Sequence, residues 1–413
     1  MSKRFWLPAI LISSTLISSI MIPSILAAGP ATAAEPASAR EAASFKVGEP
    51  LSEAQFAWWL FVQAVQPVNG SLAFETWTEQ CQLNPSIVGC PAPSAMVGKT
   101  RTLHASLLLQ NLRRKRGLSA AVQPGVECNS MQTTPLGGYP PPSNLTPVAQ
   151  FCEEVFVNTS ERDFIEQSGL KTLSGQQAYG KAHGNATTFP WEAIEVKADW
   201  VPASSYKNPF SCPDTTNKLY TETINGTCYA LVSLHISSKA KPDWVWATFE
   251  PASSITNPNR CDPKLYDTCF DPWGTTSKVP YGKGKTVPQS PQLRQLLAAV
   301  KANPAFNNYY LTGVQTLFVE GNGKPRPLGN SFTEFNAGVE PGHASCITCH
   351  KYAYFDGKNP GPGNPENNYG EPPSGWASVG YACNTKNPKG NCTPVVPNSI
   401  SQDFSWILGL MPF

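Results

Sequence analysis

Leu231-Val232-Ser233-Leu234-His235-Ile236 and Trp244-Val245-Trp246-Ala247-Thr248-Phe249 are the stretches that decide the fold of this 413-residue chain. The first alternates in polarity, which is typical of a half-buried β-strand, whereas the second is apolar on both faces and predicts a fully buried strand. The turn signal Lys241-Pro242-Asp243 lies between them. Together they predict a β-hairpin with an extended loop.

The flanking sequence predicts short helices and further strands. Ala193 to Ala198 alternates like a strand, and 311–320 contains another. Ser52 begins a capping box that opens a helix through about Val65. Other helices are predicted at 100–116, 160–167 and 289–302. With 40 Pro and 31 Gly, the connections should be long. The predicted fold class is α+β, with short helices packed on a mixed or antiparallel sheet.

Cys346-Ile347-Thr348-Cys349-His350 carries the chemistry. C-x-x-C-H is the attachment motif of a c-type haem. Its two thiols add to the porphyrin vinyl groups, and His350 becomes the proximal iron ligand. A redox thiol pair or half of a zinc site is the other interpretation of C-x-x-C. No second C-x-x-C or His pair lies nearby to complete a zinc site, and no βαβ pattern precedes the motif. We therefore expect one covalent haem c.

The distal iron ligand is left open by the sequence. Met411 is the first candidate, because it lies in a dense apolar segment near the end of the sequence. His235 on the first hairpin strand is the alternative, and another residue or an open, water-bound position remains. A Met ligand raises the reduction potential, a His ligand lowers it, and an open position permits reactions with small ligands.

The amino terminus has the pattern of an export signal. Lys3 and Arg4 precede an apolar run at 5–26 and the small-residue site Ala31-Thr32-Ala33. This pattern predicts a signal peptide at 1–33, with an uncleaved membrane anchor as the alternative. A flexible Ala/Pro/Ser-rich segment follows at 34–50. The remaining 51–413 are expected to form one globular domain with its haem-attachment region at 330–413, in the periplasm or secreted, without membrane insertion after cleavage.

The cysteines outside the motif agree with export. The chain has 12 Cys, so ten remain, an even number at short spacings that suits an oxidising compartment. Pairing between neighbours is the simplest connectivity. It predicts disulfides Cys81–Cys90, Cys128–Cys152, Cys212–Cys228, Cys261–Cys269 and Cys383–Cys392.

Several blocks resemble an uncharacterised family of exported bacterial monohaem cytochrome c proteins. The matching stretches are Phe189-Pro190, Ala193 to Ala198 with Trp200, Leu234 to Ile236 with Lys239, Trp244 to Glu250, Gly313 to Gln315, Ser345 to His350 and Asp403 to Ser405. The resemblance covers most of the mature chain. It implies a covalent haem c and a common architecture, but no substrate.

Electron transfer with a redox partner protein is the first functional expectation, because it needs only a covalent haem, an insulating pocket and an exposed edge. The alternatives are a haem-dependent oxidoreductase with an open distal site and a haem-bearing sensor or binding module. Charged residues make up only 15% of the chain and its net charge is +2, so no nucleic-acid surface is indicated.

Overall fold

The computed structural model describes residues 51–83, 128–131, 135, 139–252, 261–262, 269–282, 285–351, 353–355 and 399–408. The predicted signal peptide, the segment 34–50, the helix expected at 100–116 and Met411 lie outside these residues.

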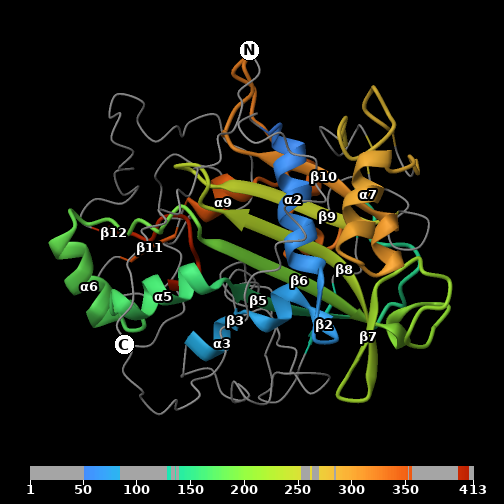
Figure 1. Cartoon of the computed structure of the whole chain (residues 1–413), viewed down its shortest axis with the longest axis horizontal. Helices are drawn as coiled ribbons and strands as arrows, with labels where there is room; N and C mark the ends of the chain where they lie inside the picture. The colour runs from blue at the N-terminus through green and yellow to red at the C-terminus, as the bar shows by residue number, and fades with distance from the viewer. Residues whose placement is uncertain are drawn as a thin grey trace, which may run out of the picture.

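A large antiparallel sheet forms the centre of the molecule (Figure 1). Its strands run in the order β10-β9-β8-β6-β5-β3, with β4 beside β5 and β7 beside β8. Every described pair in it is antiparallel, which settles the predicted choice between a mixed and an antiparallel sheet. The strands are β3 (Thr78–Glu79), β4 (Asn129–Ser130), β5 (Gln150–Val157), β6 (Ile194–Pro202), β7 (Thr221–Ile224), β8 (Thr227–Ser238), β9 (Val245–Pro251) and β10 (Tyr309–Gln315).

Short helices and two small strand pairs surround the sheet. The α-helices are α2 (Glu53–Val65), α3 (Gln80–Leu83), α5 (Thr159–Gln167), α6 (Leu173–Ala182), α7 (Pro291–Ala299), α8 (Thr333–Asn336) and α9 (Cys346–His350). The 3-10 turns are η1 (Ala73–Thr76), η3 (Ala203–Ser205), η4 (Pro304–Asn308) and η5 (Pro341–His343). The outer pairs are β1 (Pro67–Val68) with β2 (Ser71–Leu72), and β11 (Tyr354–Phe355) with β12 (Ile400–Ser401).

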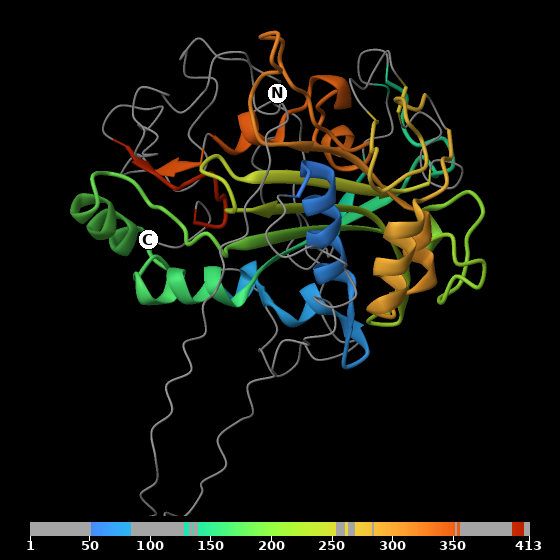
Figure 2. The same ribbon diagram turned by 45° about the horizontal axis from the view of Figure 1, so that its top comes forward.

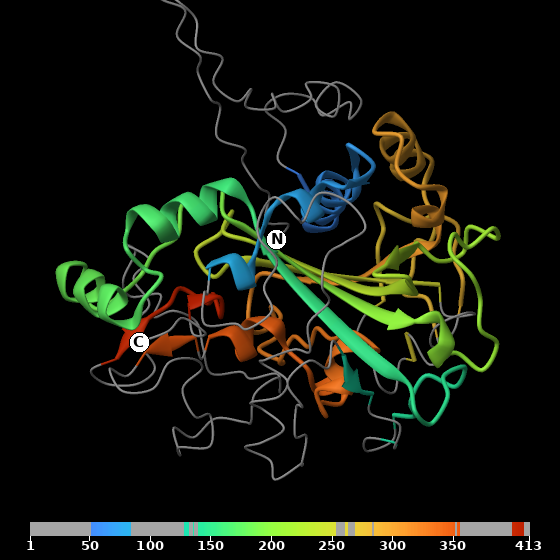
Figure 3. The same ribbon diagram turned by 90° about the horizontal axis from the view of Figure 1, so that it is seen from below.

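The apolar face of the sheet packs against α2 and α7. Ser52 caps α2 by accepting a hydrogen bond from the Gln55 amide, as its sequence predicted. Trp58 and Phe61 of α2 both pack on Phe249 of β9, with ring centroids 5.0 and 4.6 Å apart. Leu293, Leu296 and Leu297 of α7 join the same core. Figure 3 shows these helices on one side of the sheet and the C-terminal elements on the other.

The opposite face of the sheet carries polar side chains, yet it is buried as well. Strand register aligns these side chains in rows. Trp246, Ser237 and Glu195 form one row, and Thr248, His235 and Lys197 form the next. Residues 328–351, 353–355 and 399–408, which we call the C-terminal layer, lie over this polar face (Figure 2).

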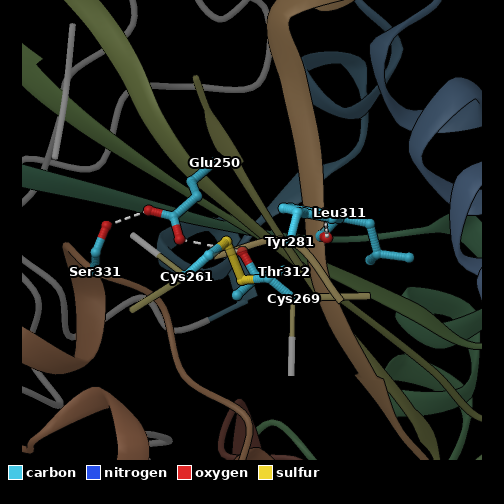
Figure 4. The surroundings of a disulfide bond; sticks show 7 residues. All are labelled: Glu250, Cys261, Cys269, Tyr281, Leu311, Thr312 and Ser331. Atoms are coloured by element: carbon cyan, nitrogen blue, oxygen red, sulfur yellow. Dashed lines mark hydrogen bonds between the residues drawn. A yellow bond between two sulfur atoms is a disulfide. The ribbon is translucent and has the colours of Figure 1, made fainter. Parts of the chain in front are cut away.

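The C-terminal layer is joined to the polar face by side-chain hydrogen bonds. Figure 4 shows one of these contacts, in which Glu250 at the end of β9 accepts bonds from Ser331 and Thr312 beside the Cys261–Cys269 disulfide. The layer therefore satisfies polar groups that would otherwise be costly to bury.

Three predicted disulfides are confirmed: Cys128–Cys152, Cys212–Cys228 and Cys261–Cys269. Cys81 is also disulfide-bonded. Its predicted partner Cys90, like the predicted pair Cys383–Cys392, lies outside the described residues. Several disulfides in one chain are typical of proteins that fold in an oxidising compartment. Across the described ranges, every helix is too short or too polar to cross a bilayer.

The predicted α+β class and the hairpin of β8 and β9 are confirmed. Helix α5 matches the prediction at 160–167, and its chain turns at Gly169, which has a left-handed φ of +68°. Helix α7 is shorter than predicted because it begins at Pro291, after the capping residue Ser290. Strand β5 and helix α6 were not anticipated from the sequence.

Trp58 makes a testable contribution to stability through its indole N–H. Nε1 donates to the buried Asp271 carboxylate at 2.6 Å, which links α2 to a loop far along the chain. Trp58→Phe keeps the aromatic packing but removes a donor from a buried charge, so we expect a loss of about 1–3 kcal/mol in the free energy of unfolding. Denaturant titration measures it. Trp59→Phe, at a half-buried position of the same helix, is the control, and equal losses in the two variants would contradict the assignment.

Candidate functional site

The C-x-x-C-H motif forms the short helix α9, which is anchored to the end of β10. Ser345 caps the helix by accepting from the Thr348 amide at 3.3 Å. Gln315 of β10 donates to the Ser345 hydroxyl at 2.9 Å and accepts from the Ile347 amide, also at 2.9 Å. One sheet residue thus fixes the first turn of the helix, so the position of the motif is set by the sheet.

His350 is oriented through its Nδ1 atom. Nδ1 lies 2.8 Å from the carbonyl oxygen of Phe404. The imidazole packs between Trp246 and Trp406, whose ring centroids are 4.4 and 5.3 Å away. Burial lowers the His350 pKa to about 4, so the ring is neutral at physiological pH. With Nδ1–H donated to the carbonyl, the lone pair is on Nε2, and no described residue forms a hydrogen bond with that atom.

The chain bends sharply where it supplies this carbonyl. Asp403 and Phe404 have left-handed φ values of 52° and 67°, an uncommon conformation for these residue types. Lys239 holds the bend, because its buried ammonium lies 2.6 Å from the Asp403 carboxylate and also donates to the Pro242 carbonyl. The Phe189 amide donates to the second Asp403 oxygen at 2.8 Å. Burial raises the pKa of Asp403 to about 6, although Lys239 opposes the rise.

His235 lies beside the motif on the polar face. One ligand atom from each of His235, Glu334 and Cys346 falls within 4.8 Å of the other two. His235 Nε2 is 3.0 Å from the Thr333 hydroxyl oxygen. The Thr333 hydroxyl donates its proton to the Asp199 carboxylate. Burial lowers the His235 pKa well below its usual value, with Lys197 and His350 adding to the effect, so this imidazole is neutral too.

Carboxyl groups outnumber cations around His235. Burial raises the pKa of Asp199 to about 7 and that of Glu334 to about 8. Lys197 stays charged: burial opposes its charge, but Glu153, 2.5 Å from its ammonium, and Asp199 raise its pKa. At neutral pH this part of the polar face therefore holds carboxyl protons as well as one ion pair.

The structure brings together four of the five predicted site residues: Cys346, Cys349, His350 and His235. Met411 lies outside the described residues. The motif packs against strand β9 through the contact between Trp246 and His350. The other two described histidines are exposed: His183 stacks on Tyr179, and His343 lies beside Glu340.

Sequence reasoning missed Asp199 and Thr333. It also did not predict that Phe404 and Trp406 contact His350 or that Glu334 lies beside Cys346. The density of tryptophan in the sequence hinted at the aromatic contacts of His350. The hydrogen-bonding groups gave no local signal, because their partners lie far away along the chain.

Comparison of the chain with protein-family models, with curated proteins and with solved structures gives no match in any of the three.

The Lys239–Asp403 ion pair gives a prediction about the bend that holds His350. Lys239→Met removes one partner of a buried pair and leaves the other uncompensated, so we expect a loss of about 3–5 kcal/mol in stability. Thermal and denaturant unfolding at neutral pH measure it, and amide exchange should become faster in 399–408. Lys171→Met is the control, because Lys171 forms an exposed ion pair with Glu166. A loss no larger than that of the control would contradict the role of the pair.

Proposed function

We propose that this protein is an exported monohaem c-type cytochrome that transfers electrons. The observation that carries the proposal is the state of the motif. Cys346 and Cys349 remain thiols, whereas every other described cysteine is in a disulfide. The imidazole that follows them has Nδ1 at a backbone carbonyl and Nε2 available for a metal. This donor set fits haem c.

In this proposal Cys346 and Cys349 hold the porphyrin through thioethers, and His350 is the proximal ligand. The haem supplies a reversible one-electron change at its iron. The protein's part is to fix and insulate it. The Phe404 carbonyl orients the His350 ring, and Trp246 and Trp406 exclude water from its sides. Gln315 keeps the attachment helix against the sheet.

Met411 remains the first candidate for the distal ligand and His235 the alternative. His235 lies close enough to the motif to be considered, but its Nε2 atom is engaged by Thr333. That contact favours a role in which His235 adjusts the polarity around the haem. A redox partner protein is part of the proposal, as is a periplasmic or secreted location after removal of 1–33.

A haem-dependent oxidoreductase with an open distal site is the second candidate function. The observation that favours it is the hydrogen-bonded series His235–Thr333–Asp199 beside Cys346, which places proton-exchanging groups next to the motif. Binding of CO or cyanide and rapid turnover of peroxide would favour this function, whereas a six-coordinate haem that ignores these ligands favours electron transfer.

Covalent haem attachment is the decisive test. Protein produced with a cytochrome c maturation system should carry one haem that acid-acetone does not extract, measured as the pyridine haemochrome. Cys346→Ala with Cys349→Ala should abolish covalent haem, and either single change should leave at most one thioether. Ile347→Val, which leaves the motif intact, is the control. Colourless wild-type protein, or one metal ion without porphyrin held at His235, Glu334 and Cys346, would refute the proposal.

The distal ligand can be identified spectroscopically. We expect the oxidised protein to show the weak far-red band of a sulfur–iron bond, and Met411→Ala to remove that band and convert the haem to a high-spin form. His235→Ala should keep the band, because His235 is held by Thr333. Loss of low-spin character in His235→Ala, with Met411→Ala unchanged, would instead make His235 the ligand.

A further inference from the structure

A second pair of ionisable groups lies between the polar face and the C-terminal layer, away from the motif's own atoms. Glu161 in the first turn of α5 is fully buried, and Glu195 of β6 is only 7% exposed. Asn158 Oδ1 accepts from the backbone amides of both Glu161 and Ile194, so the start of α5 lies against the start of β6, where the two carboxyl groups interact. Among the described residues, no amide, hydroxyl or ammonium group donates to either oxygen of Glu161. Two buried carboxylates in contact cannot both be ionised, so the pair must hold a proton.

The surroundings assign that proton to Glu161. Burial and the neighbouring Glu195 raise the pKa of Glu161 well above its usual value, and Asp403 adds to the rise. Burial also raises the pKa of Glu195, but the hydrogen bond from Glu161 and the Ser405 hydroxyl oppose the rise. Glu161 is therefore the donor, and Glu195 is the group that can take a further proton.

Few other charges face this pair. From the C-terminal layer, Asp403 is the charged group, and its charge is balanced by Lys239. On β6 the nearest charge on the same face is Lys197, which is paired with Glu153. On α5, Arg162 binds its neighbour Asp163 and Glu166 binds Lys171, both near the surface. No described cation neutralises the pair directly, so its protonation responds to charge changes nearby.

One short segment connects the pair to the proposed iron site. Asp403 and Ser405 face the two glutamates, whereas Phe404 between them binds His350 and Trp406 packs on the same imidazole. Glu195 also lies in the same sheet row as Trp246, the other ring against His350. The pair and the iron ligand are thus embedded in the same dry layer, where charges interact more strongly than in water.

We propose that the Glu161–Glu195 pair is a proton-binding site coupled to the haem, so that electron transfer is accompanied by proton transfer. This inference rests on the proposed function. When a one-electron donor reduces the iron from the ferric to the ferrous state, the site loses one positive charge. A proton from solvent then forms an O–H bond with the Glu195 carboxylate, and reoxidation releases it.

The sign of the coupling is fixed by electrostatics. Loss of positive charge at the iron raises the pKa of a nearby carboxyl, so the reduced protein binds protons more tightly. The midpoint potential must therefore fall as pH rises through the range in which Glu195 titrates. For one proton per electron, the limiting slope is 59 mV per pH unit.

Spectroelectrochemical titration of the holoprotein between pH 4.5 and 8, with dithionite as reductant, tests the coupling. We expect a falling potential in the wild type and a clearly smaller fall in Glu195→Gln, in which Asp403, Asp199 and Glu334 still titrate. In Glu161→Gln the fall should remain, because the neutral amide still donates to Glu195 in place of the protonated Glu161 carboxyl. Glu166→Gln, an exposed carboxyl on the same helix, should behave as wild type. A pH-independent wild-type potential, or an unchanged slope in Glu195→Gln, would overturn the coupling.

Two further measurements keep the test independent of folding and of haem. A pH indicator should register proton uptake when wild-type protein is reduced, and no uptake would overturn the coupling without any variant. Asp199 and Glu334 also contribute to the protonated-carboxyl infrared band at pH 7, so the test is the difference spectrum between the wild type and Glu161→Gln. That difference should contain the loss of one protonated carboxyl, whether or not haem is present. Bands of equal intensity in the two proteins would overturn the shared proton. Absence of haem from the wild type would refute the proposed function itself, and the coupling with it.

Discussion

The burial of a polar sheet face is the constraint on which the rest of the structure depends. Antiparallel sheets commonly leave one face in water, where polar side chains need no partners. Here both faces are covered, and the second keeps its hydroxyl, carboxyl and imidazole groups. Each of these would be costly to bury alone. The C-terminal layer supplies matching groups, such as Thr333 for His235 and Ser331 for Glu250, so the layer and the sheet specify each other's positions.

The same constraint explains the geometry of the motif. Helix α9 is too short to be stable on its own, and it gains its position from Gln315 and its cap Ser345. His350 depends in turn on a carbonyl presented by a left-handed bend, which Lys239 holds through Asp403. Residues from three distant parts of the chain therefore fix one imidazole ring. Because several contacts hold the same bend, the uncommon left-handed backbone at Asp403 and Phe404 is maintained.

Charge is the second consequence of covering a polar face. The buried carboxyl groups exceed the buried cations Lys239 and Lys351 and the half-buried Lys197, so several must keep protons at neutral pH. In such a layer an added charge is costly when nothing compensates it. The cost is smaller when a nearby carboxyl group binds or releases a proton at the same time. That property suits a site at which an iron would gain and lose one electron, and it links the proposed function to the proposed proton site at Glu161 and Glu195.

The sequence by itself determined what depends on neighbours along the chain. The polarity pattern of β8 and β9, the capping of α2 by Ser52, three local disulfides and the C-x-x-C-H spacing all act over short separations. Strand β5 escaped prediction because Glu153 and Glu154 look like solvent-facing residues. In the fold, Lys197 and Trp200 of the adjacent strand neutralise or bind them.

Only the tertiary structure decided which side chains complete the site. Phe404 reaches His350 across a long separation in sequence, Thr333 reaches His235, and Glu161 meets Glu195. Phe404, Thr333 and Glu161 belong to no motif that assigns them these roles. Their roles arise because a polar sheet face and a polar covering layer must exclude water together, and that requirement acts on pairs in space whatever their distance along the chain.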